Sequence, residues 1–372
     1  MGTEATRTAS AALNGICPYF TMFPLNFPYD ILRAEAEAGE AVLDPFCGRG
    51  TTNYAARLLG LPSAGIDSSP VAVAIAQAKL ANTRPVAIIR AARRILEEVA
   101  EPADVPEGEF WSWAYHPQTL RTLCRLREGL LRDCRSDARR ALRAILLGAL
   151  HGPRPKSRPA YFSNQSQRTY APKPAYAVRF WQARGLRPEP VDVLDIVAAR
   201  AERYFGAEAS RAVGIVRQGD SRRQATLAAV SRGRRFHWVI TSPPYYGMRT
   251  YLPDQWLRAW FLGGPPHVDY SMAGQLAHSG PEVFADQLRQ VWANVGAVCA
   301  PGARMVIRFG AINDRKVEPL PLLLTSLAGS GWEVLDVRPA GTAARGRRQA
   351  LHFARTRSRA LEEHDVRAVW CG

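Results

Sequence analysis

The chain lacks several features that would decide its class at once. No stretch of its 372 residues approaches the ~18 uncharged apolar residues of a membrane span. The first ten residues, MGTEATRTAS, lack the apolar core of a signal peptide. The six cysteines form no CxxC pair and no cluster with histidine, which argues against a bound metal. There is no internal repeat either. We therefore expect a reduced, cytoplasmic, globular chain with no membrane partner.

Lysine is also scarce, so almost all of the positive charge is arginine. The chain has 49 Lys+Arg against 33 Asp+Glu, which gives a formal net charge of +16. Residues 84–235 hold 29 of these cations and 15 of the acids, so this region alone carries about +14. Genome composition can explain an arginine-rich chain but not the clustering. The clustering indicates a polyanionic partner such as nucleic acid.

Short apolar runs alternate with helical segments at both ends of the chain, which is typical of an α/β fold with a mostly parallel sheet. The expected strands are Ala41–Asp44, Ser63–Asp67, Gly214–Val216, Phe236–Ile240, Arg304–Phe309, Trp332–Val337 and Gln349–Ala354. The last two are expected to form an antiparallel hairpin at the sheet edge. The expected helices are Thr51–Leu59, Pro70–Leu80, Arg121–Leu131, Ala138–Leu150 and Asp192–Tyr204.

The α/β rhythm breaks in the middle of the chain. Residues 85–212 indicate mainly helix and loop, with irregular structure between Gly152 and Pro190, where Pro, Arg and aromatic residues are frequent. The simplest domain organisation is a core made of residues 1–83 and 213–372, into which residues 84–212 are inserted.

Residues 43–52, LDPFCGRGTT, lie where an expected strand meets a helix. Gly48 and Gly50 let the backbone turn tightly and approach a ligand closely. Asp67 ends the next strand, where a carboxylate can accept hydrogen bonds from ribose hydroxyls. The loop is neither a Walker A motif nor GxGxxG, so a triphosphate or a dinucleotide is not favoured. A bare GxG can equally be a structural turn, whereas the longer pattern is far more specific.

Residues 239–247, VITSPPYYG, also follow an expected strand. Pro243 and Pro244 fix the backbone after Ser242, so its carbonyls cannot continue the sheet. A hydroxyl, rigid carbonyls and the ring of Tyr245 together suit a flat ring that carries an amino group. The oxygens would accept from the amine and the tyrosine would stack on the face of the ring. Taken alone, the segment could equally be a proline-rich turn with a packed tyrosine.

The two motifs together resemble those of the S-adenosylmethionine-dependent DNA amino-methyltransferases, which methylate cytosine N4 or adenine N6. The resemblance covers about residues 16–83 and 213–355 and implies a Rossmann-like methyltransferase sheet with a mainly helical insertion. In that family the first motif holds the methionine part of the cofactor, and its phenylalanine packs on the cofactor. The implied cofactor-binding residues of this loop and the next are Asp44, Phe46, Gly48, Gly50, Thr51, Asp67 and Ser68.

Other segments match the family less closely. Residues 216–221, VRQGDS, close a strand, and Asp220 with Ser221 matches the acid expected near the adenine amino group of the cofactor. Residues 19–24, YFTMFP, look like the motif that folds over the methionine end, which implies a cofactor contact for Phe23. Residues 299–304, CAPGAR, look like the family's turn before its fifth strand.

The resemblance implies direct methyl transfer to an exocyclic nitrogen of a base flipped out of duplex DNA. The expected catalytic residues are Ser242, Pro243, Pro244 and Tyr245. Ser242 and the Pro243 carbonyl would hold the amino hydrogens, and most of the rate would come from orientation and electrostatics. No covalent intermediate is needed, and the chain has no Pro-Cys dipeptide of the kind that carbon-5 cytosine methyltransferases use.

The two motifs identify the target base less directly than they identify the family. Serine at the first position of SPPY favours cytosine N4, whereas the order of the motifs, with the cofactor loop first, is commoner among adenine-N6 enzymes. We give the reacting residue more weight than the order. The prediction is therefore cytosine N4, with adenine N6 as the alternative.

The inserted region is the expected DNA reader, because it combines cations with side chains that can pair with base edges. The candidate DNA-binding residues are Arg154, Lys156, Asn164, Gln165, Arg168, Tyr170 and Lys173, with Arg249 after SPPY. A solvated surface loop explains any one of these residues at least as well, but the region as a whole favours DNA.

Two further alternatives stay open. An RNA guanine-N2 methyltransferase shares the first motif and the motif order but carries DPPYG at the second. A basic DNA-binding protein with an inactive methyltransferase core would be non-enzymatic. For the favoured interpretation, the expected partners are double-stranded DNA and a cognate restriction endonuclease, in a bacterial or archaeal cytoplasm.

Overall fold

The computed structural model describes residues 12–19, 23–155, 158–207, 213–247, 252–270, 276, 280–310, 317–342 and 362–372. The chain divides into two compact units. The helical unit is made of residues 1–22, 70–212 and 251–272, and the sheet unit of residues 23–69, 213–250 and 273–372. The main segment of the helical unit thus begins at Pro70, whereas position 84 was expected from the sequence, and the unit also includes residues 1–22 and a segment after the SPPY motif.

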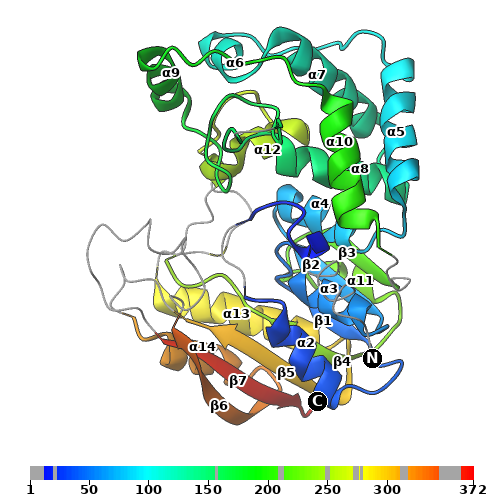
Figure 1. The fold of residues 1–372 in the computed structure, drawn as a ribbon. Helices are drawn as coiled ribbons and strands as arrows, with labels where there is room; N and C mark the ends of the chain where they lie inside the picture. Colours follow the sequence, from blue (N-terminus) through cyan, green and yellow to red (C-terminus); the bar gives the residue numbers. More distant parts are fainter. Residues whose placement is uncertain are drawn as a thin grey trace. The chain divides into compact units, whose positions relative to one another are not determined.

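The sheet unit is built on a seven-stranded sheet in the order β3-β2-β1-β4-β5-β7-β6 (Figure 1). The strands are β1 (Val42–Asp44), β2 (Ser63–Asp67), β3 (Gly214–Gln218), β4 (Phe236–Thr241), β5 (Cys299–Phe309), β6 (Trp332–Thr342) and β7 (Glu362–Trp370). The first five are parallel, whereas β7 runs antiparallel to both β5 and β6. This confirms the predicted α/β class and its mostly parallel sheet.

The antiparallel hairpin at the end of the sheet differs in detail from the prediction. The strand expected at Trp332–Val337 is the first half of β6, and its partner is β7. The strand expected at Gln349–Ala354 lies outside the described residues. Polar residues at the start of β7 (EEHD) break its apolar alternation, which is why the sequence pattern did not indicate a strand there.

Five helices described in the sheet unit cover the two faces of the sheet. They are α2 (Asn26–Glu35), α3 (Thr51–Leu58), α11 (Gln224–Ser231), α13 (Pro281–Gly296) and α14 (Pro319–Leu327). Alternate strand residues point to opposite faces. Leu43, Val239 and Ile307 therefore pack with α11, α13 and α14. Val42 and Trp238 pack with α2 and α3 on the other face. Proline begins α13 and α14, where its missing N–H costs nothing.

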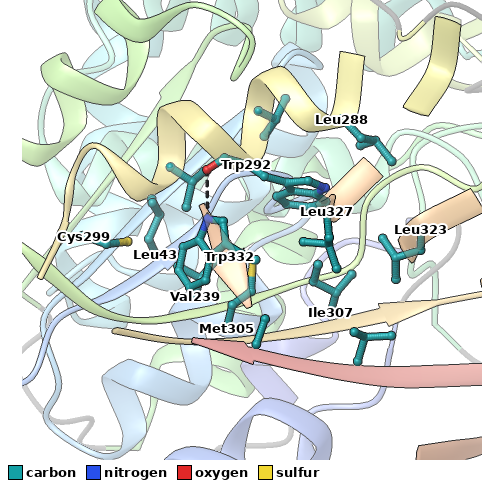
Figure 2. Packing of buried hydrophobic residues seen from close by; sticks show 14 of the residues in the cluster. Leu43, Val239, Leu288, Trp292, Cys299, Met305, Ile307, Leu323, Leu327 and Trp332 are labelled. Atoms are coloured by element: carbon teal, nitrogen blue, oxygen red, sulfur yellow. Dashed lines mark hydrogen bonds between the residues drawn. The ribbon is translucent and has the colours of Figure 1, made fainter. Parts of the chain in front are cut away.

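Trp292 and Trp332 are at the centre of the larger hydrophobic cluster (Figure 2). The Trp332 indole donates a hydrogen bond to the Trp292 carbonyl over 3.0 Å, and the Trp292 indole donates to the Ser326 hydroxyl over 3.0 Å. Both indole N–H groups are thus satisfied inside a core of Leu, Ile, Val and Met side chains. Full burial of one large apolar side chain stabilises a fold by about 1.5–3 kcal/mol, so this cluster secures β5, α13 and β6 together.

The helical unit contains α4 (Pro70–Lys79), α5 (Pro85–Glu98), α6 (Glu109–Ala114), α7 (Pro117–Arg132), α8 (Asp137–Ala149), α9 (Pro174–Ala183), α10 (Val193–Phe205), a 3₁₀ turn η1 (Leu252–Gln255) and α12 (Trp256–Phe261). The predicted helices in this region are confirmed within three or four residues at their ends. Helix α9 lies inside the segment predicted to be irregular, because its short apolar stripe of Ala177, Val178 and Trp181 is too brief to stand out. None of the helices described in either unit is both long and apolar enough to span a membrane.

Buried donors hold the backbone of the loop between α8 and α9. Arg258, which is fully buried, donates to the carbonyls of Leu147, Arg168 and Thr169 at 3.1–3.2 Å. His151 bonds the Gln167 carbonyl through Nδ1 over 2.7 Å, and burial, together with the charge of Arg258, lowers its pKa to about 3. The neutral imidazole and the guanidinium replace the regular backbone pairing that the loop lacks.

Candidate active site

The two motifs end at the same edge of the sheet. After β1 the chain goes to β2 and β3 on one side, and it then returns to β4 on the other side of β1. Strands β1 and β4 are neighbours and parallel, so the loops that follow Asp44 and Thr241 leave the sheet side by side. Such a reversal of strand order is where open α/β sheets bind their ligands.

Two buried hydrogen bonds link the elements that border these loops. The Thr241 hydroxyl donates to Asp44 Oδ1 over 2.6 Å, and the Thr52 hydroxyl donates to the Ile240 carbonyl over 3.0 Å. All of Thr52, Asp44 and Thr241 are inaccessible to solvent. Sequence reasoning missed Thr241 and Thr52 as positioning residues, although both stand inside the motifs that it singled out.

The loop 45–50, called the cofactor loop below, folds back onto the end of β2. Gly48 and Gly50 have φ values of 50° and 73°, in the left-handed region that glycine adopts without strain. The Cys47 N–H donates to the Ile66 carbonyl over 2.9 Å, and the Gly48 N–H donates to Asp67 Oδ2 over 2.9 Å. The predicted glycine turn and the predicted acid after β2 are therefore in direct contact.

Asp44 lies at the base of the cofactor loop and is fully buried. Burial raises its pKa to about 7, against the lowering effect of hydrogen bonds from Thr241 and the Phe46 N–H. The Thr52 hydroxyl also lowers this pKa, although it donates to the Ile240 carbonyl, and Oδ2 has no hydrogen bond of regular geometry among the described residues.

Asp67 accepts two backbone hydrogen bonds, from Gly48 through Oδ2 and from Ser69 through Oδ1 at 2.8 Å. Desolvation raises its pKa to about 6, and these two bonds limit the rise. The residue is half-buried, so one side of it still faces outward. A carboxylate held this way keeps lone pairs free for further donors.

The other predicted cofactor residues occupy varied positions around this loop. Phe46 is half-buried and packs edge-on to Trp292 with ring centroids 6.0 Å apart. Thr51 is buried in the first turn of α3, behind Gly50. Ser68 is exposed, and its carbonyl accepts from Gln218 over 3.1 Å. Phe23 contacts Phe27 edge-on at 5.1 Å, on the face of the sheet covered by α2 and α3.

Asp220 and Ser221 follow β3 and already have partners within the chain. Asp220 binds Arg222 through paired hydrogen bonds of 2.7–3.0 Å. Burial acts to raise the pKa of Asp220, but these bonds and the charge of Arg222 outweigh it and hold the pKa below its usual value. The buried Ser221 hydroxyl donates to the Pro45 carbonyl over 2.7 Å, so it fixes the backbone at the start of the cofactor loop.

The residues of the SPPY motif differ in exposure. Ser242, Pro244 and Tyr245 are half-buried and Pro243 is buried. The Tyr245 hydroxyl donates to Glu363 Oε1 over 2.6 Å, and its ring packs edge-on to Phe309 at 5.4 Å. Glu363 lies in β7, 118 residues away in sequence, and no motif in the sequence pointed to it.

The predicted DNA-binding residues of the helical unit are mostly at its surface. Arg154, Gln165, Arg168 and Lys173 are exposed and Tyr170 is half-buried. Arg154 forms an ion pair with Glu189 at 3.3 Å and donates to the Arg187 carbonyl, so part of its charge is used within the loop. Lys156 and Arg249 lie outside the described residues.

Asn164 differs from this group because its side chain is buried and fully used. Its amide donates to the carbonyls of Trp113 and Leu186 at 3.1 and 2.8 Å, and its Oδ1 accepts from the Gln165 N–H. Only 2% of the residue is exposed. The prediction that Asn164 reads a base therefore fails in this structure, because the amide already fixes the loop.

One family model matches the chain. Residues 4–78, which include the cofactor loop and Asp67, match the model described as "DNA methylase", which covers N6 and N4 enzymes. This confirms, for that segment, the resemblance predicted from DPFCGRGTT. The cofactor of such methylases is S-adenosylmethionine. No curated protein sequence matches the chain.

Solved structures of low similarity superpose on the chain. An rRNA methyltransferase, AviRa from Streptomyces viridochromogenes, is 13% identical, with a TM-score of 0.39 and coverage of 98% of this chain and 93% of that one. A methyltransferase from Methanosarcina mazei is 9% identical, with a TM-score of 0.35 and coverage of 95% and 99%. A Thermus thermophilus protein provisionally assigned as a DNA modification methylase is 21% identical, with a TM-score of 0.25 and coverage of 41% and 51%. At these TM-scores the likenesses carry no weight for function.

The residues at this edge of the sheet fit S-adenosylmethionine. Asp44 and Asp67 place two carboxyl groups at this end of the sheet, which suits the positive charge of the methionine part. Asp67 retains acceptor capacity for the two ribose hydroxyls. The half-buried ring of Phe46 offers an apolar surface beside them. By contrast, no group of three or more His, Cys, Asp or Glu side chains among the described residues is placed to hold a metal ion.

Asp67→Ala is expected to weaken S-adenosylmethionine binding about 10- to 100-fold, because hydrogen bonds to a charged group contribute about 1.5–3 kcal/mol. Titration calorimetry measures the affinity. Glu37→Ala, an exposed acid of the same unit, is the matched control and should leave the affinity unchanged. An unaltered dissociation constant for Asp67→Ala would refute the ribose-acceptor role.

The raised pKa of Asp44 predicts a pH-dependent stability. Its pKa in the folded chain, about 7, is above the ordinary 3.8, so the folded state holds this proton more tightly than the unfolded state does. The stabilisation is complete below about pH 4 and is lost as pH rises through 7. Asp44→Asn cannot titrate at this position. Between pH 5 and pH 8 the free energy of unfolding of the parent chain should therefore fall by about 1–3 kcal/mol more than that of Asp44→Asn. Urea unfolding at both pH values measures this difference, and an equal change in the free energy of unfolding for the two chains would contradict the prediction.

Proposed function

We propose that the protein transfers a methyl group from S-adenosylmethionine to the exocyclic N4 of cytosine in duplex DNA. The DNA methylase match over residues 4–78, which include the cofactor loop and Asp67, supports this proposal. The choice of cytosine follows from Ser242, because a neutral hydroxyl stands where adenine-N6 enzymes more often carry Asp or Asn. The motif order favours the adenine alternative, and the experiment below distinguishes the two.

The observation that carries the proposal is the bond between the two strand ends from which the motif loops leave. Asp44, which borders the cofactor loop, and Thr241, which precedes Ser242, share a 2.6 Å hydrogen bond between neighbouring strands. A cofactor bound against Asp44 and Asp67 would therefore be held at a fixed distance from a base bound at Ser242. Fixed placement of two reactants is worth up to about 7–11 kcal/mol of barrier, which suits a reaction without a covalent intermediate.

Each residue of the site has a distinct task in this proposal. Bound S-adenosylmethionine supplies an electrophilic methyl group on a sulfonium. Ser242 and the Pro243 carbonyl accept hydrogen bonds from the amino group of the base and so orient its nitrogen lone pair. Pro243 and Pro244 hold these acceptors rigidly, since neither can rotate about φ. Tyr245 packs against the base.

The helical unit is proposed to bind the DNA. Its exposed cations Arg158, Arg168 and Lys173 belong to the loop between α8 and α9, whose backbone is held by Arg258, His151 and Asn164. Ordered loops lose little entropy on binding, so their side chains can contribute fully to affinity. The exposed amides of Gln165 and Gln167 are the groups in this loop suited to base edges.

The biological setting is part of the same proposal. A site-specific DNA methyltransferase protects DNA from a cognate restriction endonuclease or marks it for other purposes, and in a bacterium or archaeon it works in the cytoplasm on nucleoid DNA. The basic balance of the chain, +16, suits such a polyanion.

Expression in a host free of DNA methylation tests the function. Digestion of the host DNA to nucleosides should yield N4-methylcytosine, and modification-sensitive sequencing should place it at one recognition site. Ser242→Ala should lower the yield by about 100-fold, because it removes an acceptor at the reacting nitrogen. Ser112→Ala, an exposed serine of α6, should not. N6-methyladenine alone would establish the alternative, and methylation of tRNA but not DNA would contradict the proposal.

Arg168→Ala is expected to weaken DNA binding about 3- to 10-fold and to reduce the slope of log affinity against log salt by about 0.9, the value for one phosphate contact. Gel shifts at several salt concentrations measure both. The affinity for S-adenosylmethionine should stay constant. Arg94→Ala is the control, since Arg94 is also exposed but is paired with Glu98 at 2.7 Å. Identical salt slopes for the parent chain and Arg168→Ala would remove Arg168 from the DNA surface.

A further inference from the structure

Three segments that are distant in sequence meet at Tyr245. The tyrosine belongs to the loop after β4, Phe309 ends β5 and is followed by Gly310, and Glu363 stands near the start of β7, opposite Gly341 of β6. The Tyr245 hydroxyl donates to Glu363 Oε1 over 2.6 Å, and the Tyr245 and Phe309 rings meet at an interplanar angle of 77°. The ring is thus held at its hydroxyl and along its side.

Glu363 and Asp44 are the buried acids among the described residues, and 5% of the surface of Glu363 is exposed. Burial of a carboxyl group is costly unless hydrogen bonds replace its water. A hydroxyl that donates to a carboxylate over so short a distance makes one of the stronger hydrogen bonds in proteins. The hydrogen bond therefore restrains the orientation of the Tyr245 ring.

Gly310 leaves the room in which this pair fits. A Cβ at position 310 would lie 2.9 Å from Glu363 Cγ and 3.3 and 3.4 Å from two ring atoms of Tyr245. Any larger residue would push the acid and the ring apart. The end of β5 is thus shaped around the contact.

We propose that Glu363 is a positioning residue for the transfer reaction, acting through Tyr245. This inference rests on the proposed function. Glu363 itself touches neither cofactor nor base, but it fixes the ring against which the base packs. A displacement of about 1 Å at such a position can cost about 100-fold in rate. Strand β7 would thereby contribute to the site through the position of Glu363.

The test compares single-turnover methyl transfer from labelled S-adenosylmethionine to DNA of a methylation-free host. Glu363→Leu and Tyr245→Phe should each lower the rate about 10-fold or more, and the double variant should be no slower than the slower single variant. The cofactor dissociation constant should change less than about twofold, which a general structural defect would not allow. Glu363→Gln should keep most of the rate, because its amide oxygen can still accept from Tyr245.

Glu362, the exposed neighbour of Glu363 in β7, supplies the matched controls. Glu362→Leu and Glu362→Gln should transfer at the parent rate. A parent rate for Glu363→Leu, or losses that multiply in the double variant, would overturn the role of Glu363. If Glu363→Leu does not fold, two near-isosteric variants replace it. Tyr245→Phe removes the hydrogen bond, whereas Glu363→Gln keeps it. An undiminished rate for Tyr245→Phe would then overturn the proposal. A parent chain that methylates no DNA would overturn the proposed function and this role together.

Discussion

The pairing of β1 with β4 is the constraint on which the site depends. These strands are adjacent in the sheet but almost 200 residues apart in sequence, and the reversal of strand order falls between them. The hydrogen bond from Thr241 to Asp44 fixes their ends to each other in a fully buried setting. Loss of one partner would leave the other polar group buried without compensation, so the register of the two loops is strongly specified.

The acceptor of this bond, Asp44, is one of two carboxyl groups with a raised pKa at this end of the sheet. Asp44 is buried beside Asp67, and each carboxyl has a pKa raised by loss of water. Acids in this condition favour a neutral form until a cation arrives. In the proposed function, the ammonium and sulfonium of S-adenosylmethionine would supply that positive charge. The exposed cations of the helical unit would attract phosphate instead.

Sequence patterns predicted the parts of the fold that are encoded locally. The strands around DPFCGRGTT and TSPPYYG follow from short apolar runs, and the glycine turn with Asp67 follows from spacing. Both were found where expected, with the Gly48 N–H bound to Asp67. Helix α9 and strand β7 were missed, because a short apolar stripe and a polar start give weak periodic signals.

Contacts between distant segments could not be predicted in this way. Asn164 has the composition of a base reader, but its burial depends on how α6 and the segment after α9 pack around it. Glu363 has no motif at all, and its place beside Tyr245 follows only from the register of β7 against β5 and β6. Ser221 was predicted to contact the cofactor, yet its hydroxyl is bound to the Pro45 carbonyl. In each case tertiary packing decides which polar groups remain free.

The position of β7 has a consequence for how the sheet unit is completed. It follows every other strand in sequence, yet it lies between β5 and β6 (Figure 1). During synthesis β5 therefore presents an open edge until residues 362–370 emerge, and β6 has no neighbour on which to pair. Exposed edges of this kind invite pairing with other chains. A chain shortened before residue 362 would lose an interior strand of the sheet and not an edge strand. The nine residues of β7 are therefore needed to join β6 to the rest of the sheet.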